Sequence, residues 1–164
     1  MTGAQRVYVP STLRRLRAVV TADGLGPAPF AAHTVTRGVR AELPDAGEEE
    51  WEYAASAAAA QTSVSLLTDQ DPPRRVVIAV DVSVARETGA DDVTLVEIDD
   101  VVPMRRVAAV LVDAADAEED VAAARRARAE GSPDAERLLE RCLDHELGWW
   151  ATQEVAALLR DTGL

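Results

Sequence analysis

The chain has 164 residues, a length that is most economically explained by one globular domain spanning residues 1–164 with a single core. Hydrophobic residues make up 48% of it and aromatic residues only 4%, so each aromatic side chain carries an unusual share of the buried area. The formal net charge of −12 argues against nucleic acid and anionic membranes as partners, because both present negative phosphate groups.

The basic and sulfur-containing residues exclude several chemistries. All 17 basic residues are arginine, so the chain has no lysine for a Schiff base or a Walker-type phosphate site. Cys142 is the only cysteine, which excludes an intrachain disulfide and a zinc site built on several thiolates. The chain also lacks an apolar signal segment and any apolar run of membrane-spanning length. We therefore expect a cytoplasmic protein without a cofactor.

The first half of the chain predicts two strands that alternate with two helices. Residues 6–10 indicate a short strand, and residues 12–22 a helix capped by Ser11. Residues 30–36 indicate a second strand, and residues 48–67 a long helix with an acidic first turn. One stripe of that long helix has helical spacing and is expected to face the sheet. It consists of Tyr53, Ala57, Ala60, Val64 and Leu67.

The second half predicts three strands followed by helices. Residues 74–82 are apolar at almost every position, as in a strand that is covered on both faces. Residues 93–98 and 107–112 indicate two further strands, and residues 116–130 a helix. Ser132-Pro133 then starts a helical stretch that continues, with a possible break, to Arg160.

Together these elements predict an α/β domain with a mixed sheet of about five strands and helices packed on it. The order is strand, helix, strand, helix, three strands, and two helices, with a C-terminal helical region from about residue 115. Right-handed crossovers would make the first three strands parallel.

The segment DHELGWWATQE, residues 144–154, concentrates unusual side chains. On one regular helix, Trp150 falls on the core face with Leu147, whereas Trp149, His145 and Thr152 fall on nearly the opposite face. Trp149 is then covered by another element of the same domain, by a second copy or another protein, or by a ligand. Tryptophan is common among interface anchors, so His145, Trp149 and Thr152 form a candidate interaction surface.

Four polar residues form a candidate pocket at the strand ends: Tyr8, Asp81, Asp113 and Glu154. Asp81 and Asp113 each follow an apolar strand, where open sheets often bind ligands. Two carboxylates there could hold a divalent metal or act as acid and base, or could serve only as loop and capping residues. Glu154 falls within the apolar stripe of the last helix, so it needs an arginine or a tyrosine hydroxyl as its partner.

The two histidines do not predict a metal site. His145 has only Glu146 beside it, and adjacent residues on a helix point in different directions. His33 lies far away in sequence and is interpreted as a structural or surface residue. Cys142 lies on an apolar helical face, which is typical of an inert core thiol.

Three stretches of the chain resemble a family of uncharacterised actinobacterial proteins. They are RVYVPSTL (residues 6–13), the EYAA helix (residues 52–55) with RVVIAVDV (residues 75–82), and DHELGWWATQE (residues 144–154). The resemblance spans nearly the whole chain, implies a single-domain bacterial cytoplasmic protein and carries no assigned activity or catalytic residue.

Two functional hypotheses follow from the sequence. The first is a small non-enzymatic interaction module that uses its C-terminal helical surface for self-association or for a protein partner. The second is a small-molecule-binding or hydrolytic protein with its pocket at the strand ends. A metal-dependent enzyme is the least favoured alternative, because the chain has only two histidines.

Overall fold

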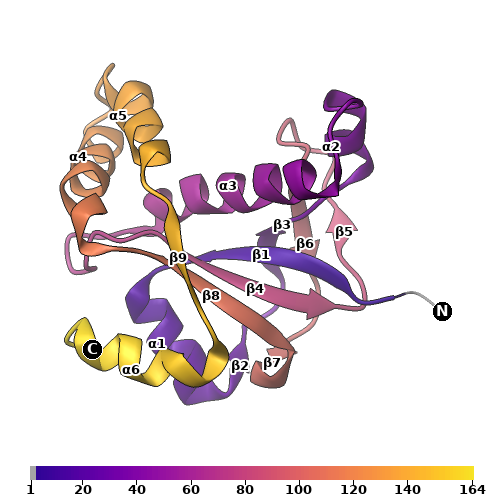
Figure 1. The fold of residues 1–164 in the computed structure, drawn as a ribbon, viewed down its shortest axis with the longest axis horizontal. Helices are drawn as coiled ribbons and strands as arrows, with labels where there is room; N and C mark the ends of the chain where they lie inside the picture. The colour runs from indigo at the N-terminus through magenta and orange to yellow at the C-terminus, as the bar shows by residue number, and fades with distance from the viewer. Residues whose placement is uncertain (1–2) are drawn as a thin grey trace.

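The computed structural model describes residues 3–164, which form a seven-stranded sheet with helices on both faces (Figure 1). The strand order is β5-β6-β3-β1-β4-β8-β9, and each neighbouring pair is antiparallel. The strands are β1 (Gln5–Ser11), β3 (Phe30–His33), β4 (Val76–Val82), β5 (Arg86–Glu87), β6 (Leu95–Ile98), β8 (Val107–Asp113) and β9 (Leu147–Trp150). A separate ladder joins β2 (Gly24–Leu25) to β7 (Val102–Pro103).

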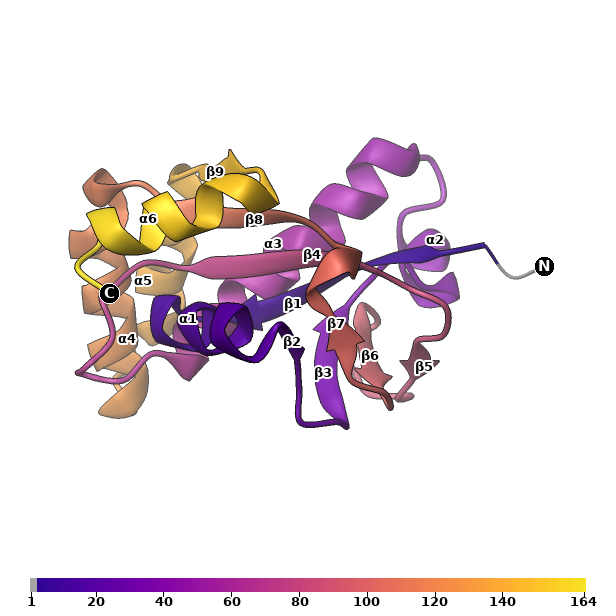
Figure 2. The same ribbon diagram turned by 90° about the horizontal axis from the view of Figure 1, so that it is seen from below.

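The helices form a layer on each face of the sheet. Helix α3 covers one face, with α4 and α5 packed beside its end, whereas α1 and α6 cover the other face (Figures 1 and 2). The helices are α1 (Leu13–Ala22), α2 (Arg37–Glu42), α3 (Glu48–Leu66), α4 (Glu118–Ala129), α5 (Ala135–Arg141) and α6 (Val155–Asp161). Short 3-10 turns are η1 (Met104–Arg106), η2 (Ala115–Ala117), η3 (Cys142–Asp144) and η4 (Thr152–Glu154).

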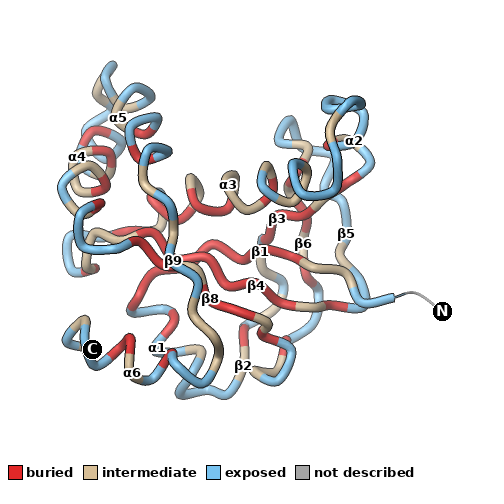
Figure 3. The backbone as a smooth tube through the Cα atoms, in the orientation of Figure 1, coloured by how far each residue is buried: buried red, intermediate tan, exposed pale blue. Residues whose placement is uncertain are grey.

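Alternation along the central strands divides the core into two layers. On β1, Val7 and Val9 point to the face with α1 and α6, while Tyr8 points to the face with α3. The first layer is built from branched aliphatic residues of the sheet and helices, and it is the larger one. The central strands β1, β4 and β8 are buried over most of their length (Figure 3). The layer under α3 is mostly alanine, so this helix lies close to the sheet.

The face of α3 that meets the sheet differs from the predicted stripe. Its buried residues are Ala55, Ala59, Ala60, Ser63 and Val64. Tyr53 is 68% exposed, so its expected place in the buried stripe was wrong. Tyr8 rises from β1 into the space under the helix, and the alanines at positions 55 and 59 leave room for it.

The prediction of a mixed sheet of about five strands, the first three parallel, was wrong. All seven strands found in residues 3–164 are antiparallel to their neighbours. After α1, residues 23–29 carry the chain back to the end of the sheet where β1 finished, so β3 enters in the opposite direction. The right-handed crossover rule holds only for parallel strands, so it does not apply to the connection from β1 to β3.

The start of the first helix also differs in detail. Thr12 rather than Ser11 is the N-cap of α1, because the Thr12 hydroxyl accepts the backbone N–H of Arg15 at 3.2 Å. Asp23 ends the helix in the left-handed conformation at φ 55°. Ser11 is buried on β1 instead, so it belongs to the sheet.

Candidate functional site

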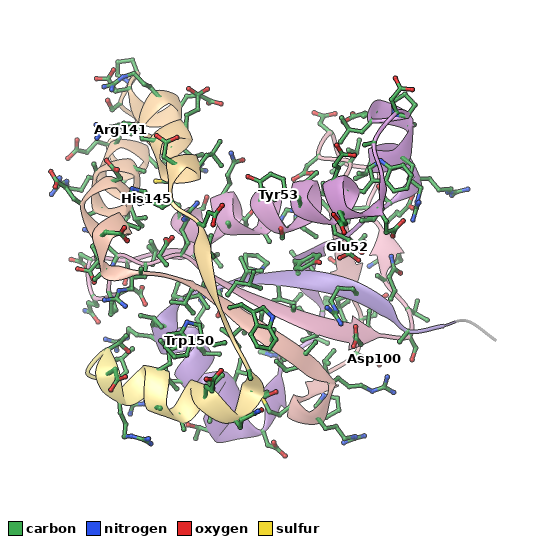
Figure 4. The ribbon with its side chains drawn as sticks, in the orientation of Figure 1. Glu52, Tyr53, Asp100, Arg141, His145 and Trp150 are labelled. Carbon is green, nitrogen blue, oxygen red and sulfur yellow. The ribbon has the colours of Figure 1, made fainter. Side chains whose placement is uncertain are left out.

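The tryptophan pair lies on β9 at one edge of the sheet, where β8 is its only neighbouring strand within residues 3–164. Side chains alternate along a strand, so the two indoles point to opposite faces. Trp150 packs against the aliphatic core on the side of α6 (Figure 4). Trp149 lies opposite Leu111 and is 65% exposed. No other element of the described chain covers most of Trp149, so the first of the three alternatives, cover by the same domain, was wrong.

The helix predicted over residues 144–154 was wrong, and strand geometry rearranges its faces. Leu147, expected beside Trp150, packs on the α3 side of the sheet with Leu111, whereas Trp150 packs on the other side. His145 has extended backbone and precedes Leu147 by two residues, so it shares the side of Trp149. Thr152 begins η4, which leads to α6 on the opposite face, and does not continue this surface.

A groove adjoins β9 on the side of Trp149. It has a volume of about 290 Å³ and separates α3 from residues 143–147. Tyr53 stands on its α3 wall, Leu143 on the opposite wall, and Leu111 at its floor. Tyr53 and Leu143 are both exposed, at 68% and 42%. Trp149 lies on the same side of β9 as Leu147, which lines the groove. We call Trp149, Tyr53 and Leu143 the β9 surface.

His145 fixes the chain that enters β9. Its Nε2 lies 2.9 Å from a carboxylate oxygen of Asp120 on α4, and this hydrogen bond is the main cause that lowers the pKa of Asp120. Its backbone carbonyl accepts a hydrogen bond of 2.7 Å from Arg75. Both contacts fix the side chain and the backbone of His145 in place, so His145 is better described as a support of the β9 surface than as a reactive group.

Two residues of the predicted pocket, Tyr8 and Asp81, lie on the α3 side of the sheet in separate pairs. The Arg6 guanidinium binds Asp81 at 2.7 Å, and the Tyr8 hydroxyl donates to Glu52 of α3 at 3.2 Å. Burial, with the charge of Glu52, raises the pKa of Tyr8 to about 12, so this phenol stays protonated at neutral pH. These contacts join two strands and a helix.

The other two, Asp113 and Glu154, lie elsewhere. Asp113 ends β8, is 2% exposed, and binds Arg75 through both carboxylate oxygens at 2.8 Å. Glu154 is exposed and accepts the backbone N–H of Ala151 at 2.8 Å, so neither its expected burial nor its expected side-chain partner is found. The structure therefore does not bring Tyr8, Asp81, Asp113 and Glu154 together in one pocket.

A larger cleft lies apart from the predicted pocket. It has a volume of about 490 Å³ and is bounded by α1, the end of β1, residues 24–31 and the last turns of α3. Within the described residues β1 pairs with β3 only at Tyr8 and His33, although it pairs with β4 along its whole length. Pro10, which has no backbone N–H to donate, follows the point where that ladder stops. The cleft occupies the resulting gap in the sheet.

A buried chain of hydrogen bonds connects this cleft to the far side of β3. His33 is 1% exposed, and its Nε2 lies 3.0 Å from the hydroxyl of Thr62, which lines the cleft. Its Nδ1 lies 2.7 Å from the Thr94 hydroxyl, which donates to Asp92 at 2.6 Å. Burial lowers the pKa of His33, with Asp92 opposing this shift, so the ring is neutral at pH 7. Because the Thr94 hydroxyl donates to Asp92, Nδ1 of the neutral ring donates to Thr94. Nε2 is then an acceptor that faces the Thr62 hydroxyl, which also lies 3.1 Å from the carbonyl of Ala58.

Nothing on the described part of the chain gathers metal ligands. Among residues 3–164 no cluster of three or more histidine, cysteine, aspartate or glutamate side chains could hold an ion. Cys142 is buried between α3, α4 and α5, and burial raises the pKa of its thiol. That placement agrees with an unreactive core cysteine.

A family model described as a family of unknown function (DUF6912) matches residues 5–159, and the chain belongs to this family. The match spans the central sheet and both helical layers. No curated protein and no solved structure matches the chain. In residues 3–164 no helix has the length and apolar character needed to cross a membrane.

Proposed function

We propose that this member of a family of unknown function is a non-enzymatic interaction module, and that its β9 surface binds a second copy of the chain. The observation that carries the proposal is Trp149, 65% exposed on the outermost strand beside an apolar groove. All basic residues of the chain are arginine, which fits an actinobacterial source. We place the protein in the cytoplasm and treat it as a single domain.

An open strand edge favours association through the backbone. The outer side of β9 carries N–H and C=O groups that no neighbouring strand pairs within the described chain. Proteins usually protect such edges with lysine, proline or a covering loop. Strand β9 (LGWW) contains neither lysine nor proline. Gly148 and Trp149 are both exposed there, so a partner strand can approach closely.

A second copy suits this edge because antiparallel pairing of a strand with itself is self-complementary. A two-fold axis through the middle of β9 places each residue against a fixed partner and makes the same contacts twice. The two sheets would then continue into one another. Each Trp149 would become buried across the interface, where tryptophan commonly acts as an anchor.

Sedimentation velocity over a range from low micromolar to several hundred micromolar tests this proposal. The wild type is expected to pass from monomer to dimer. Trp149→Thr keeps strand propensity but removes the anchor, so it should weaken the dimer by about 2 kcal/mol, roughly thirtyfold in Kd.

Val84→Thr is the matched control, because Val84 is 72% exposed in the loop after β4, away from β9. It should dimerise as the wild type does. A monomer at every concentration would overturn the proposal, and so would equal weakening by both substitutions.

A further inference from the structure

The cleft between β1 and β3 has the size and lining of a small-molecule site. Its volume of about 490 Å³ falls within the range of roughly 300–1,000 Å³ that is usual for ligand pockets. Figure 2 shows how the elements that contribute its lining are arranged, with α1 beside β1 and the segment from β2 to β3 turning below them. The lining is mostly apolar, and Val19, Leu25, Phe30, Leu66 and Ile78 supply its larger side chains.

These walls come from elements far apart in the chain. One face of α1 contributes residues at helical spacing, Arg15, Ala18, Val19 and Ala22. Phe30 is only half-buried, which leaves part of its ring open to the cleft. An apolar ligand body would therefore gain contact on several sides and displace water from the walls.

Apart from Ser11, whose hydroxyl donates to the backbone carbonyl of Thr12, two polar side chains stand among the mostly apolar lining residues. Arg15 is exposed on α1, and no carboxylate of residues 3–164 lies within ion-pair distance of it. Thr62 is the second. Its hydroxyl lies 3.0 Å from His33 Nε2 and 3.1 Å from the backbone carbonyl of Ala58, and its oxygen is able to accept from a ligand.

We propose that this cleft binds a small apolar carboxylic acid. The carboxylate pairs with the Arg15 guanidinium, whose planar fork matches its two oxygens. The hydrocarbon body lies against Val19, Leu25 and Ile78, and a hydroxyl on the ligand, where present, donates to Thr62. The site is separate from the β9 surface, since β4 and β8 lie between β1 and β9 in the sheet. It therefore goes beyond the proposed function and does not depend on it.

Isothermal titration calorimetry with octanoate and with octan-1-ol tests the site in the full chain. Both probes offer the same apolar body, but only octanoate offers the charge. Wild type is expected to bind octanoate up to roughly fivefold more tightly than octanol, because a pair at an exposed arginine contributes up to about 1 kcal/mol. Arg15→Gln should remove that difference, whereas Arg17→Gln, on the same helix but outside the lining, should keep it.

A second pair of variants tests the location. Ala18 is exposed on α1 and lines the cleft, so Ala18→Phe should fill it without disturbing the core and abolish binding of both probes. Ala156→Phe, at an exposed position of α6, should leave binding intact.

No saturable heat with octanoate in the wild type would overturn the proposal. Equal losses from Arg15→Gln and Arg17→Gln would overturn it as well, because they would indicate a general effect of charge. If circular dichroism shows that Ala18→Phe is unfolded, the arginine pair decides the question alone.

Discussion

At the scale of single residues, His33 shows how burial sets protonation. The ring is 1% exposed and burial lowers its pKa below the ordinary 6.5, so the folded protein holds it neutral. As the pH falls through 6.5, the unfolded chain binds a proton that the folded chain does not yet bind. As the pH falls below 6.5, His33 therefore lowers the free energy of unfolding. This loss ends once the pH has passed the lower pKa that His33 has in the folded protein.

The matching prediction compares wild type with His33→Gln, which keeps hydrogen-bonding groups but does not titrate. Urea unfolding at pH values on either side of 6.5 should show a smaller loss of stability in acid for the variant. Asp71 and Asp120, whose pKa values are lowered in the folded protein, also lose stabilisation in acid, but they do so equally in both proteins. Identical pH profiles would contradict this role for His33.

Residue chemistry could be read only in part from the sequence. The absence of lysine and the single cysteine excluded whole classes of mechanism without any structure. The partners of Asp81 and Asp113 were not predictable, because Arg6 and Arg75 reach them across strand pairs. His33 was interpreted as a structural or surface residue, and its hydrogen bonds to Thr62 and Thr94 were hidden by distances of 29 and 61 residues along the chain.

At the scale of elements, the ion pair between Arg75 and Asp113 connects three segments. Arg75 precedes β4, Asp113 ends β8, and the same guanidinium holds the carbonyl of His145 just before β9. Both side chains are almost completely buried. The pair therefore positions the edge strand on which Trp149 is displayed.

Removing one member of this pair should be costly. Asp113→Asn leaves a buried guanidinium without its counter-charge, so we expect a loss of about 3 kcal/mol or more in the free energy of unfolding measured in urea. Asp81→Asn is the control, since its pair with Arg6 is more than a third exposed and should contribute less than about 1 kcal/mol. Losses of equal size would contradict the distinction between the two pairs.

Local pattern predicted the strongly periodic elements well. Residues 74–82 contain β4, and the acidic start at residue 48 opens α3 as expected. It failed in residues 144–154, where short apolar sequence is compatible with either helix or strand. There β8 supplies a pairing edge and Arg75 holds the preceding carbonyl, so tertiary contacts selected the strand.

At the scale of the whole molecule, charge governs how copies meet. Two chains of net charge −12 repel one another at long range, and salt screens that repulsion, with a Debye length of about 10 Å at ~0.1 M salt. We therefore expect dimerisation through the β9 surface to strengthen as sodium chloride is raised from low to moderate concentration. Sedimentation equilibrium at several salt concentrations measures the change in Kd. Weakening with salt would indicate recognition of opposite charge and would contradict the proposed second copy.

The sequence by itself determined the excluded chemistries, the α/β character and the position of most helices and strands, since composition and short-range periodicity encode these directly. Only the tertiary structure decided the strand order, the antiparallel directions, the edge position of β9 and the gap between β1 and β3. Those features depend on which distant segments pack together, and the free energy of such packing is shared among many residues. A pattern in one segment reports which of its faces is apolar, but the rest of the fold determines what that face meets.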